Sequence, residues 1–431
     1  MEGGVVIRDP DKVKQKAGVD HRVTSGGTVR HSIAPYPLRN MPSLKVFRVD
    51  TFIVLLRLKQ TPMRLLSLQK YTGFLLILLL SACAEQEKPV TKEEALQLAK
   101  SIEGSMSRQS GAKFNEAFDG EALVERMKKE ATFKISAVMA REAANGLKSG
   151  KMGTELVRSM GKDGSYELVK QYEKDKKQHL VFRLFGTDGK LNYHDLELVK
   201  KKEKVRIADM YVYLAGENLS STLAQTFSML DDNYDNMSKE DREKIGNMKR
   251  IRKLLNEGKH QEADQLYQQF PEVLKKQKMM QVVRIEIASE LGDDVYSQAM
   301  DDFERAYPDA PNLYLMKIDA YILRKDFDGA MNAVNKLDSL IDKDTFLDYY
   351  RGLICKLKED KEGQDIYFTR LVKNKPDFGP GVLELVAFHM DNNQTDKGVL
   401  VAQQYKASSK ASQEQFDVLY QLYPELQKKL E

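Results

Sequence analysis

Two short polar stretches hold the side chains that are best suited to chemistry. Tyr193, His194 and Asp195 are consecutive, and Asp209 and Tyr211 lie in the next run of β-forming residues. A histidine near a carboxylate can hold or transfer a proton close to neutral pH, and phenol hydroxyls can orient a ligand. The sequence therefore indicates a possible pocket lined by Tyr193, His194, Asp209 and Tyr211.

The geometry of a β-strand limits this pocket. Adjacent residues of a strand face opposite sides of a sheet, so His194 and Asp195 cannot both enter one pocket without a bulge. His194 would share its face with Leu196 and Leu198, which is more typical of a hydrogen-bonded histidine in a core. A structural role is the favoured interpretation of His194, and an acid–base role is the alternative.

The two cysteines differ in their surroundings. Cys355 falls at a core-facing position of a predicted helix, which favours a buried, inert thiol over a nucleophile. The sequence has no glycine-rich phosphate loop, His-Glu-x-x-His motif, paired-cysteine zinc motif or nucleophile elbow. We therefore predict no catalytic residues, no metal and no cofactor.

Composition favours a soluble, globular protein with a charged surface. Hydrophobic residues make up 42% of the 431 residues and charged residues 31%. The net charge of +4 is too small to indicate nucleic-acid binding. We therefore expect partners other than nucleic acid.

The segment that ends at Cys83 has the layout of an export signal. A cationic start after Met63 precedes an apolar stretch over 72–82, about half of the roughly 20 residues that a membrane-spanning helix needs. Leu80-Ser81-Ala82-Cys83 resembles the lipobox of bacterial lipoproteins. The resemblance implies that 63–83 is a signal peptide and that acylated Cys83 anchors the mature chain to a membrane. The alternative is a buried helix that ends in an ordinary cysteine.

The residues around this segment fit the same interpretation. Residues 1–62 show no sustained periodicity, and we hypothesise that they are a misassigned start or a disordered extension before a true start at Met63. Residues 84–90 are polar and would form a tether that reaches at most ~25 Å. Ala84 follows the cysteine, which implies an outer-membrane location facing the periplasm if the cell has two membranes.

Residues 91–235 predict an α+β domain. Thr91 and Glu94 form a capping box before helical periodicity over 91–160. Four β-rich runs follow and predict a four-stranded antiparallel meander at 166–172, 179–185, 191–199 and 205–214. Helices followed by a meander resemble the NTF2-like/cystatin-like folds, on element order alone.

Residues 236–431 predict an all-α region with an internal repeat. Gly258-Lys259-His260 and Lys325-Asp326-Phe327 are similar to the inter-helix turn of tetratricopeptide (TPR) repeats. Pro308 and Pro376 lie two 34-residue periods apart, with repeats starting at 311, 345 and 379. In this register Gly352 and Phe368 are the small and aromatic residues of one helix pair, and 412–431 is a capping helix. The resemblance implies a TPR-like solenoid; a non-repeating bundle is the alternative.

These features predict a lipid-anchored cell-envelope scaffold that binds a protein or peptide in a groove of the repeats. The first helices would expose the residues that contact the partner, namely Asn312, Lys317, Tyr350, Arg351, Glu384 and His389. The alternative interpretation of these residues is a solvated surface of an array that only spaces the domains. The runner-up function is a small-ligand-binding or enzymatic protein that uses the pocket of the α+β domain.

The turns of the meander predict one basic edge, because alternate turns lie at the same end of a sheet. Its residues are Lys174, Lys176, Lys177, Lys200, Lys201, Lys202 and Lys204. Such an edge can serve solubility and protection from strand pairing. It can also attract anionic lipid headgroups or an acidic partner.

Overall fold

The computed structural model describes residues 89–131, 135, 152–162, 164–186, 189, 191–232, 248–308, 313–408 and 410–431. The predicted signal peptide, Cys83 and nearly all of the tether lie outside the described residues, and so does Asn312. The predicted helical periodicity between 132 and 151 also falls almost entirely outside them.

The first helices pack their apolar faces together and onto the sheet. They are α1 (Lys92–Met106), α2 (Ala112–Ala117), α3 (Gly120–Glu130) and α5 (Met152–Met160). The predicted capping box is confirmed: the Glu94 N–H donates to Thr91 Oγ1 at 3.2 Å, and the Thr91 N–H donates to Glu94 Oε2 at 3.0 Å. The buried side of α1 carries Ala95, Ala99 and Ile102, as the 3–4 spacing predicts.

An antiparallel meander forms the only sheet in the described part of the chain. Its strands lie in chain order: β1 (Ser165–Lys174), β2 (Lys177–Phe185), β3 (Leu191–Lys201), β4 (Lys204–Val212) and β5 (Glu217–Asn218). The four predicted strands are confirmed. The prediction of only four strands is wrong, because β5 has two residues and is too short to show an alternating pattern.

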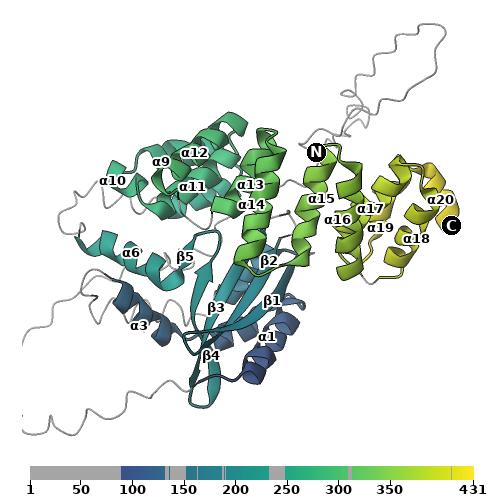
Figure 1. The fold of residues 1–431 in the computed structure, drawn as a ribbon. Coiled ribbons are helices and arrows are strands. Elements are labelled where there is room, and N and C mark those ends of the chain that lie inside the picture. The colour runs from purple at the N-terminus through teal and green to yellow at the C-terminus, as the bar shows by residue number, and fades with distance from the viewer. Residues whose placement is uncertain are drawn as a thin grey trace, which may run out of the picture. The chain divides into compact units, whose positions relative to one another are not determined.

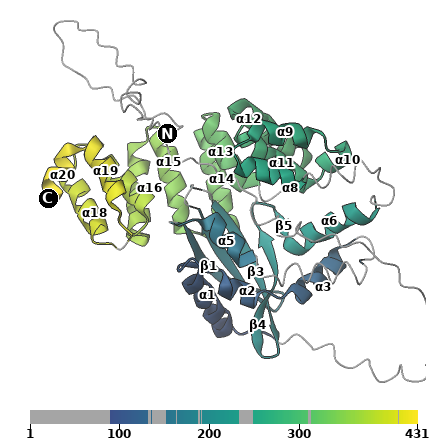
Figure 2. The same ribbon diagram turned by 180° about the vertical axis from the view of Figure 1, so that it is seen from behind.

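The two faces of the sheet differ in polarity. One face carries Phe182, Leu196 and Met210, which are fully buried, and α1, α2 and α5 lie across it (Figure 2). The opposite face carries polar and aromatic side chains, including Arg183 and Asp195. The strict alternation along β2 and β3 separates the two groups.

After β5, the described part of the chain is helical (Figure 1). Its helices are α6 (Leu219–Asp232), α8 (Met248–Asn256), α9 (His260–Gln268), α10 (Glu272–Lys275), α11 (Lys278–Ser289), α12 (Asp293–Ala306), α13 (Leu313–Leu323), α14 (Phe327–Leu340), the 3-10 helix η4 (Thr345–Leu347), α15 (Asp348–Leu357), α16 (Lys361–Asn374), α17 (Gly379–Asp391), α18 (Thr395–Lys406), α19 (Gln413–Leu422) and α20 (Pro424–Leu430). The predicted single helix over 412–431 is two helices, because the chain leaves helical geometry at Tyr423 and Pro424 starts a new helix.

The helices from α11 onward pack as consecutive pairs, α11 with α12, α13 with α14, α15 with α16 and α17 with α18. The second helices of these pairs begin 34 residues apart, at Asp293, Phe327, Lys361 and Thr395. Asp326 and Asp360 cap two of them by accepting the backbone N–H three residues later, at 2.9 Å in each case.

A glycine lies where α15 crosses α16. A Cβ added to Gly352 would meet the ring of Phe368 at 2.5 Å, which is closer than side chains approach each other. Phe368 is fully buried. The predicted roles of Gly352 and Phe368 at a helix contact are therefore confirmed.

Aromatic side chains join the sheet to the helical region. All described residues belong to one unit of the chain that covers 42–431. The ring of Phe185, at the end of β2, lies 4.9 Å from that of Phe346 in η4 and 5.3 Å from that of Phe378 before α17. The ring of Tyr349 contacts that of Phe378 at 5.2 Å. One apolar core therefore continues from α1 to α17.

Candidate functional site

The four predicted pocket residues do not converge in the structure. Tyr193 points to the helical region, where its hydroxyl donates to Asp344 Oδ2 at 3.0 Å. His194 points to the opposite face of the sheet. Asp209 contacts the start of α6, and Tyr211 lies beside Tyr213. Tyr193, Asp209 and Tyr211 share one face of the sheet, but strand alternation places His194 on the other face, so the four residues do not line one pocket together.

His194 has the structural role that the sequence favoured. It is fully buried, with Nδ1 3.2 Å from the Tyr166 hydroxyl and Nε2 3.2 Å from the Asn192 amide. Burial lowers the pKa of His194 to about 3, so the imidazole is neutral at physiological pH. An imidazole with so low a pKa is a weak base, and both of its ring nitrogens already have hydrogen-bonding partners, so His194 supports the core.

The neutral state of His194 makes the free energy of unfolding depend on pH. Its pKa falls from 6.5 when unfolded to about 3 when folded, so the contribution is complete above pH 6.5 and is lost as pH falls towards 3. We expect the wild type to lose about 2 kcal/mol more stability between pH 7 and pH 5 than His194→Gln, which cannot titrate. Urea unfolding at the two pH values measures this difference; equal losses would contradict it.

Asp209 fixes the beginning of α6. Its Oδ2 accepts the Ser220 hydroxyl at 2.5 Å, and its Oδ1 accepts the backbone N–H of Ser220 at 3.2 Å. Burial raises the pKa of the Asp209 carboxyl, while the hydrogen bonds from Ser220 and Met210 oppose that rise. Burial likewise raises the pKa of Tyr211 to about 12. Both arrangements are those of structural residues.

The structure pairs Asp195 with a different histidine, which sequence reasoning missed. His179 Nδ1 lies 3.0 Å from Asp195 Oδ1, and the Tyr172 hydroxyl donates to Asp195 Oδ2. The Tyr172 and His179 rings are stacked, with centroids 4.9 Å apart. The His179 and Asp195 side chains are 13% and 12% exposed, so this His179 cluster (Tyr172, His179 and Asp195) borders solvent on the polar face of the sheet.

The register of the meander contained the signal for this cluster. A two-residue turn after Lys174 places Tyr172 directly opposite His179. Asp195 is opposite Val181, and therefore diagonal to His179 on the same face. The cluster is held together by hydrogen bonds, and no described side chain beside it has the arrangement of an activated nucleophile.

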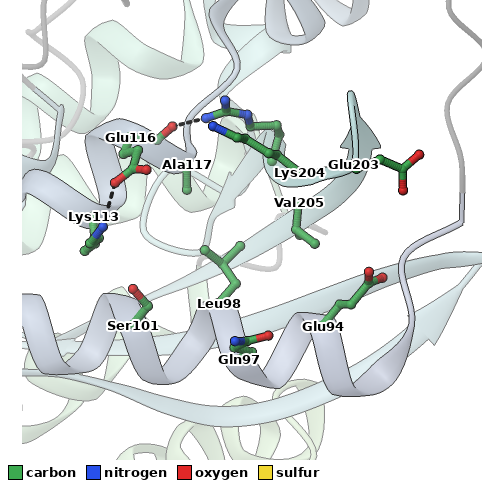
Figure 3. A pocket seen from close by; sticks show the side chains of 11 residues that line it. Glu94, Gln97, Leu98, Ser101, Lys113, Glu116, Ala117, Glu203, Lys204 and Val205 are labelled. Carbon is green, nitrogen blue, oxygen red and sulfur yellow. Dashed lines mark hydrogen bonds and ion pairs between the residues drawn. The ribbon is translucent and has the colours of Figure 1, made fainter.

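A shallow hollow of about 430 Å³ lies between α1, α2 and the β3–β4 hairpin (Figure 3). Leu98 and Val205 are its apolar part. Lys113 forms an ion pair with Glu116 at 2.8 Å, and Arg206 donates to the Glu116 carbonyl. Several charges of both signs along its rim are therefore already paired.

Three of the predicted groove residues are buried, which contradicts the expectation that they are exposed. Tyr350 is 1% exposed, and its hydroxyl donates to the Gly189 carbonyl at 3.3 Å. Arg351 is 7% exposed and donates to Asp338 at 2.7 Å and to Asp348 at 3.0 Å. His389 is 5% exposed. The register placed these residues on the correct helices, but the docked sheet and the neighbouring helix cover them.

The remaining groove residues are partly accessible. Lys317 forms an ion pair with Glu304 of α12, and Glu384 accepts from Lys356 at 2.6 Å. Lys356 is 36% exposed and Glu384 is 20% exposed. This pair bridges α15 and α17, the first helices of two successive pairs. The surface around Lys317, Lys356 and Glu384, here called the first-helix face, is the part of the predicted groove that borders solvent.

Cys355, metal ligands and membrane-spanning helices are the remaining features to consider. Cys355 is free and 3% exposed, and burial raises the pKa of its thiol to about 11, as expected for an inert thiol. No three side chains of the described residues are arranged to bind a metal ion. Within the same residues, no helix combines the length and the apolar character that crossing a membrane requires.

Comparisons with protein-family models, with curated proteins and with solved structures found no match to this chain.

Proposed function

We propose that this protein is a lipid-anchored scaffold of the cell envelope and that its helical region is a TPR-like solenoid that binds a protein or peptide. The observation that carries the proposal is the 34-residue spacing of α12, α14, α16 and α18. Small buried residues at the helix contacts, such as Ala330, Gly352 and Gly398, agree with this family of repeats. Repeats of this type typically present an extended surface to a partner.

The first-helix face is the proposed binding surface. It presents charged side chains of both signs at half-buried positions, a setting suited to the polar rim of a peptide site. The small-ligand alternative lacks a comparable observation, because His194 faces away from the other three pocket residues and is already hydrogen-bonded to Tyr166 and Asn192. We therefore favour the scaffold.

A photoreactive amino acid can test this surface in cells. Placed at Lys356, it should form a specific crosslinked product in envelope fractions. Placed at Ile366, which is 51% exposed on the second helix α16, it should not. Equal labelling at both positions, or none at Lys356, would contradict binding at the first-helix face.

The lipid anchor is tested separately. We expect Cys83→Ala to release the protein from the membrane fraction, because Cys83 is the only lipid-attachment residue that the sequence indicates and acyl chains would supply the attachment. Cys355→Ala is the matched control and should leave membrane attachment unchanged. Fractionation followed by detergent extraction gives the result, and a Cys83→Ala protein that still pellets with the membrane would disprove the anchor.

A further inference from the structure

The two ends of the sheet have different neighbours. At one end the β1–β2 and β3–β4 hairpins turn, and their last pairs are Lys174 with Lys177 and Lys201 with Lys204. Both hairpin turns, which carry the lysines of the predicted basic edge, therefore lie at one end of the sheet. At the other end Phe185 and Gly189 contact the helical region.

The described chain begins at the hairpin end. Lys200 forms an ion pair with Glu94 in the first turn of α1 at 2.7 Å, and it lies 3.4 Å from Glu203 in the hairpin turn. Val90, just before α1, is 7% exposed and so is packed against this end. From there α1 runs along the sheet, because Gln109 beyond its last turn donates to the Gly161 carbonyl near the start of β1. Residue 83 can thus be no farther than about 22 Å from Pro89.

Four lysines at the hairpin tips have no ion pair in the described part of the chain. They are Lys174, Lys176, Lys202 and Lys204, and all four are exposed. Left-handed backbone at Asp175, Lys176, Lys202 and Glu203 makes tight turns and holds these residues at the tips. The other lysines of the basic edge form ion pairs within the protein, since Lys177 pairs with Glu197 and Lys201 with Asp119.

We infer that this hairpin end faces the membrane and that its four free lysines contact anionic phospholipid headgroups. The inference rests on the proposed anchor at Cys83. Glu173, Asp175 and Glu203 are exposed at the same tips, so the local excess of positive charge is small. A tether from Cys83 keeps the tips at a high local concentration near the bilayer. The lysines therefore need only orient the hairpin end towards the membrane. Their long side chains let the ammonium groups extend beyond the shorter carboxylates of the same tips.

The test uses the full lipidated chain in vesicles of phosphatidylcholine, with or without phosphatidylglycerol. A fluorophore is attached at the hairpin end through Glu173→Cys or on α18 through Gln403→Cys. Both positions are exposed, whereas Cys355 is buried. Spin-labelled headgroups quench the fluorophore at short range, and flotation of the vesicles reports attachment independently.

We expect quenching at position 173 only with phosphatidylglycerol, and little quenching at position 403. Replacing Lys174, Lys176, Lys202 and Lys204 by Gln should lower that quenching at least about threefold while flotation is unchanged. The same replacement of Lys361, Lys397, Lys410 and Lys428 is the charge-matched control and should have no effect. These four lysines are exposed on the helical region and form no ion pair with another described residue. The inference would be overturned if quenching at position 173 were the same with and without the four tip lysines, or with and without phosphatidylglycerol. Failure of the wild type to float with the vesicles would overturn the anchor itself.

Discussion

A Gly352→Leu variant should lose at least about 3 kcal/mol of its free energy of unfolding, the upper end of the cost of overpacking a core. The first added carbon already meets the Phe368 ring at 2.5 Å, and three more carbons would have to enter the same contact between α15 and α16. Gly352→Ala should cost less, and combining it with Phe368→Leu should recover part of that cost. Such recovery is the sign of a direct steric contact.

The matched comparison is Gly189→Ala in the β2–β3 turn. Gly189 has φ of +81°, so alanine should cost about 1 kcal/mol through backbone strain. Urea unfolding of a soluble form that starts at residue 84 gives both values. If Gly352→Leu were as stable as the wild type, the assignment of this helix contact would be wrong.

Arg183→Met is expected to lower the free energy of unfolding by a similar amount, about 3–5 kcal/mol. Arg183 is 2% exposed and donates two hydrogen bonds to Asp344, at 2.6 and 2.8 Å. It also donates to Glu167, and its guanidinium lies 4.2 Å from the centroid of the Phe346 ring. Methionine would keep most of the side-chain volume but leave the Asp344 carboxylate buried without its cation. A buried charge without a partner destabilises the folded state strongly.

Two further variants separate this loss from general damage. Asp344→Asn in the Arg183→Met background removes the unpaired charge, so the double variant should be more stable than the sum of the two single effects predicts. Lys170→Met breaks the ion pair with Asp342, a residue that is 67% exposed, and should cost at most about 1 kcal/mol. Equal unfolding midpoints for Arg183→Met and Lys170→Met would show that the buried pair contributes no more than a surface pair.

The local features of the fold could be predicted because each depends on residues close together in the chain. The capping box at Thr91 needs only Glu94, and the turn after Lys174 needs only its flanking strands. The helix pairs were predictable for the same reason, since a 34-residue spacing repeats the same local contacts. The starts at Thr345 and Gly379 agree with the first residues of η4 and α17.

The contacts between the sheet and the helical region were harder to predict because they join segments that are distant in the sequence. Nothing near Arg183 in the sequence indicates Asp344, which lies 161 residues away. The Tyr350 hydroxyl donates to the Gly189 carbonyl, 161 residues away, and the repeat register alone could not indicate that contact. The pairing of Asp195 with His179 follows from strand register, because His179 lies on the same face of the sheet as Asp195 and the adjacent His194 does not.

The interface between the sheet and the helical region also determines whether the two parts stay together after the chain is cleaved. Phe185, Phe346 and Phe378 meet across it, and the Arg183–Asp344 pair is buried beside them. A nick between α6 and α8 would separate two polypeptides that still share one core. We expect the two pieces to remain associated, and to reassemble when expressed as separate chains, whereas either piece alone would expose aromatic surface and aggregate. The predicted boundary between domains is thus a candidate site for a split protein.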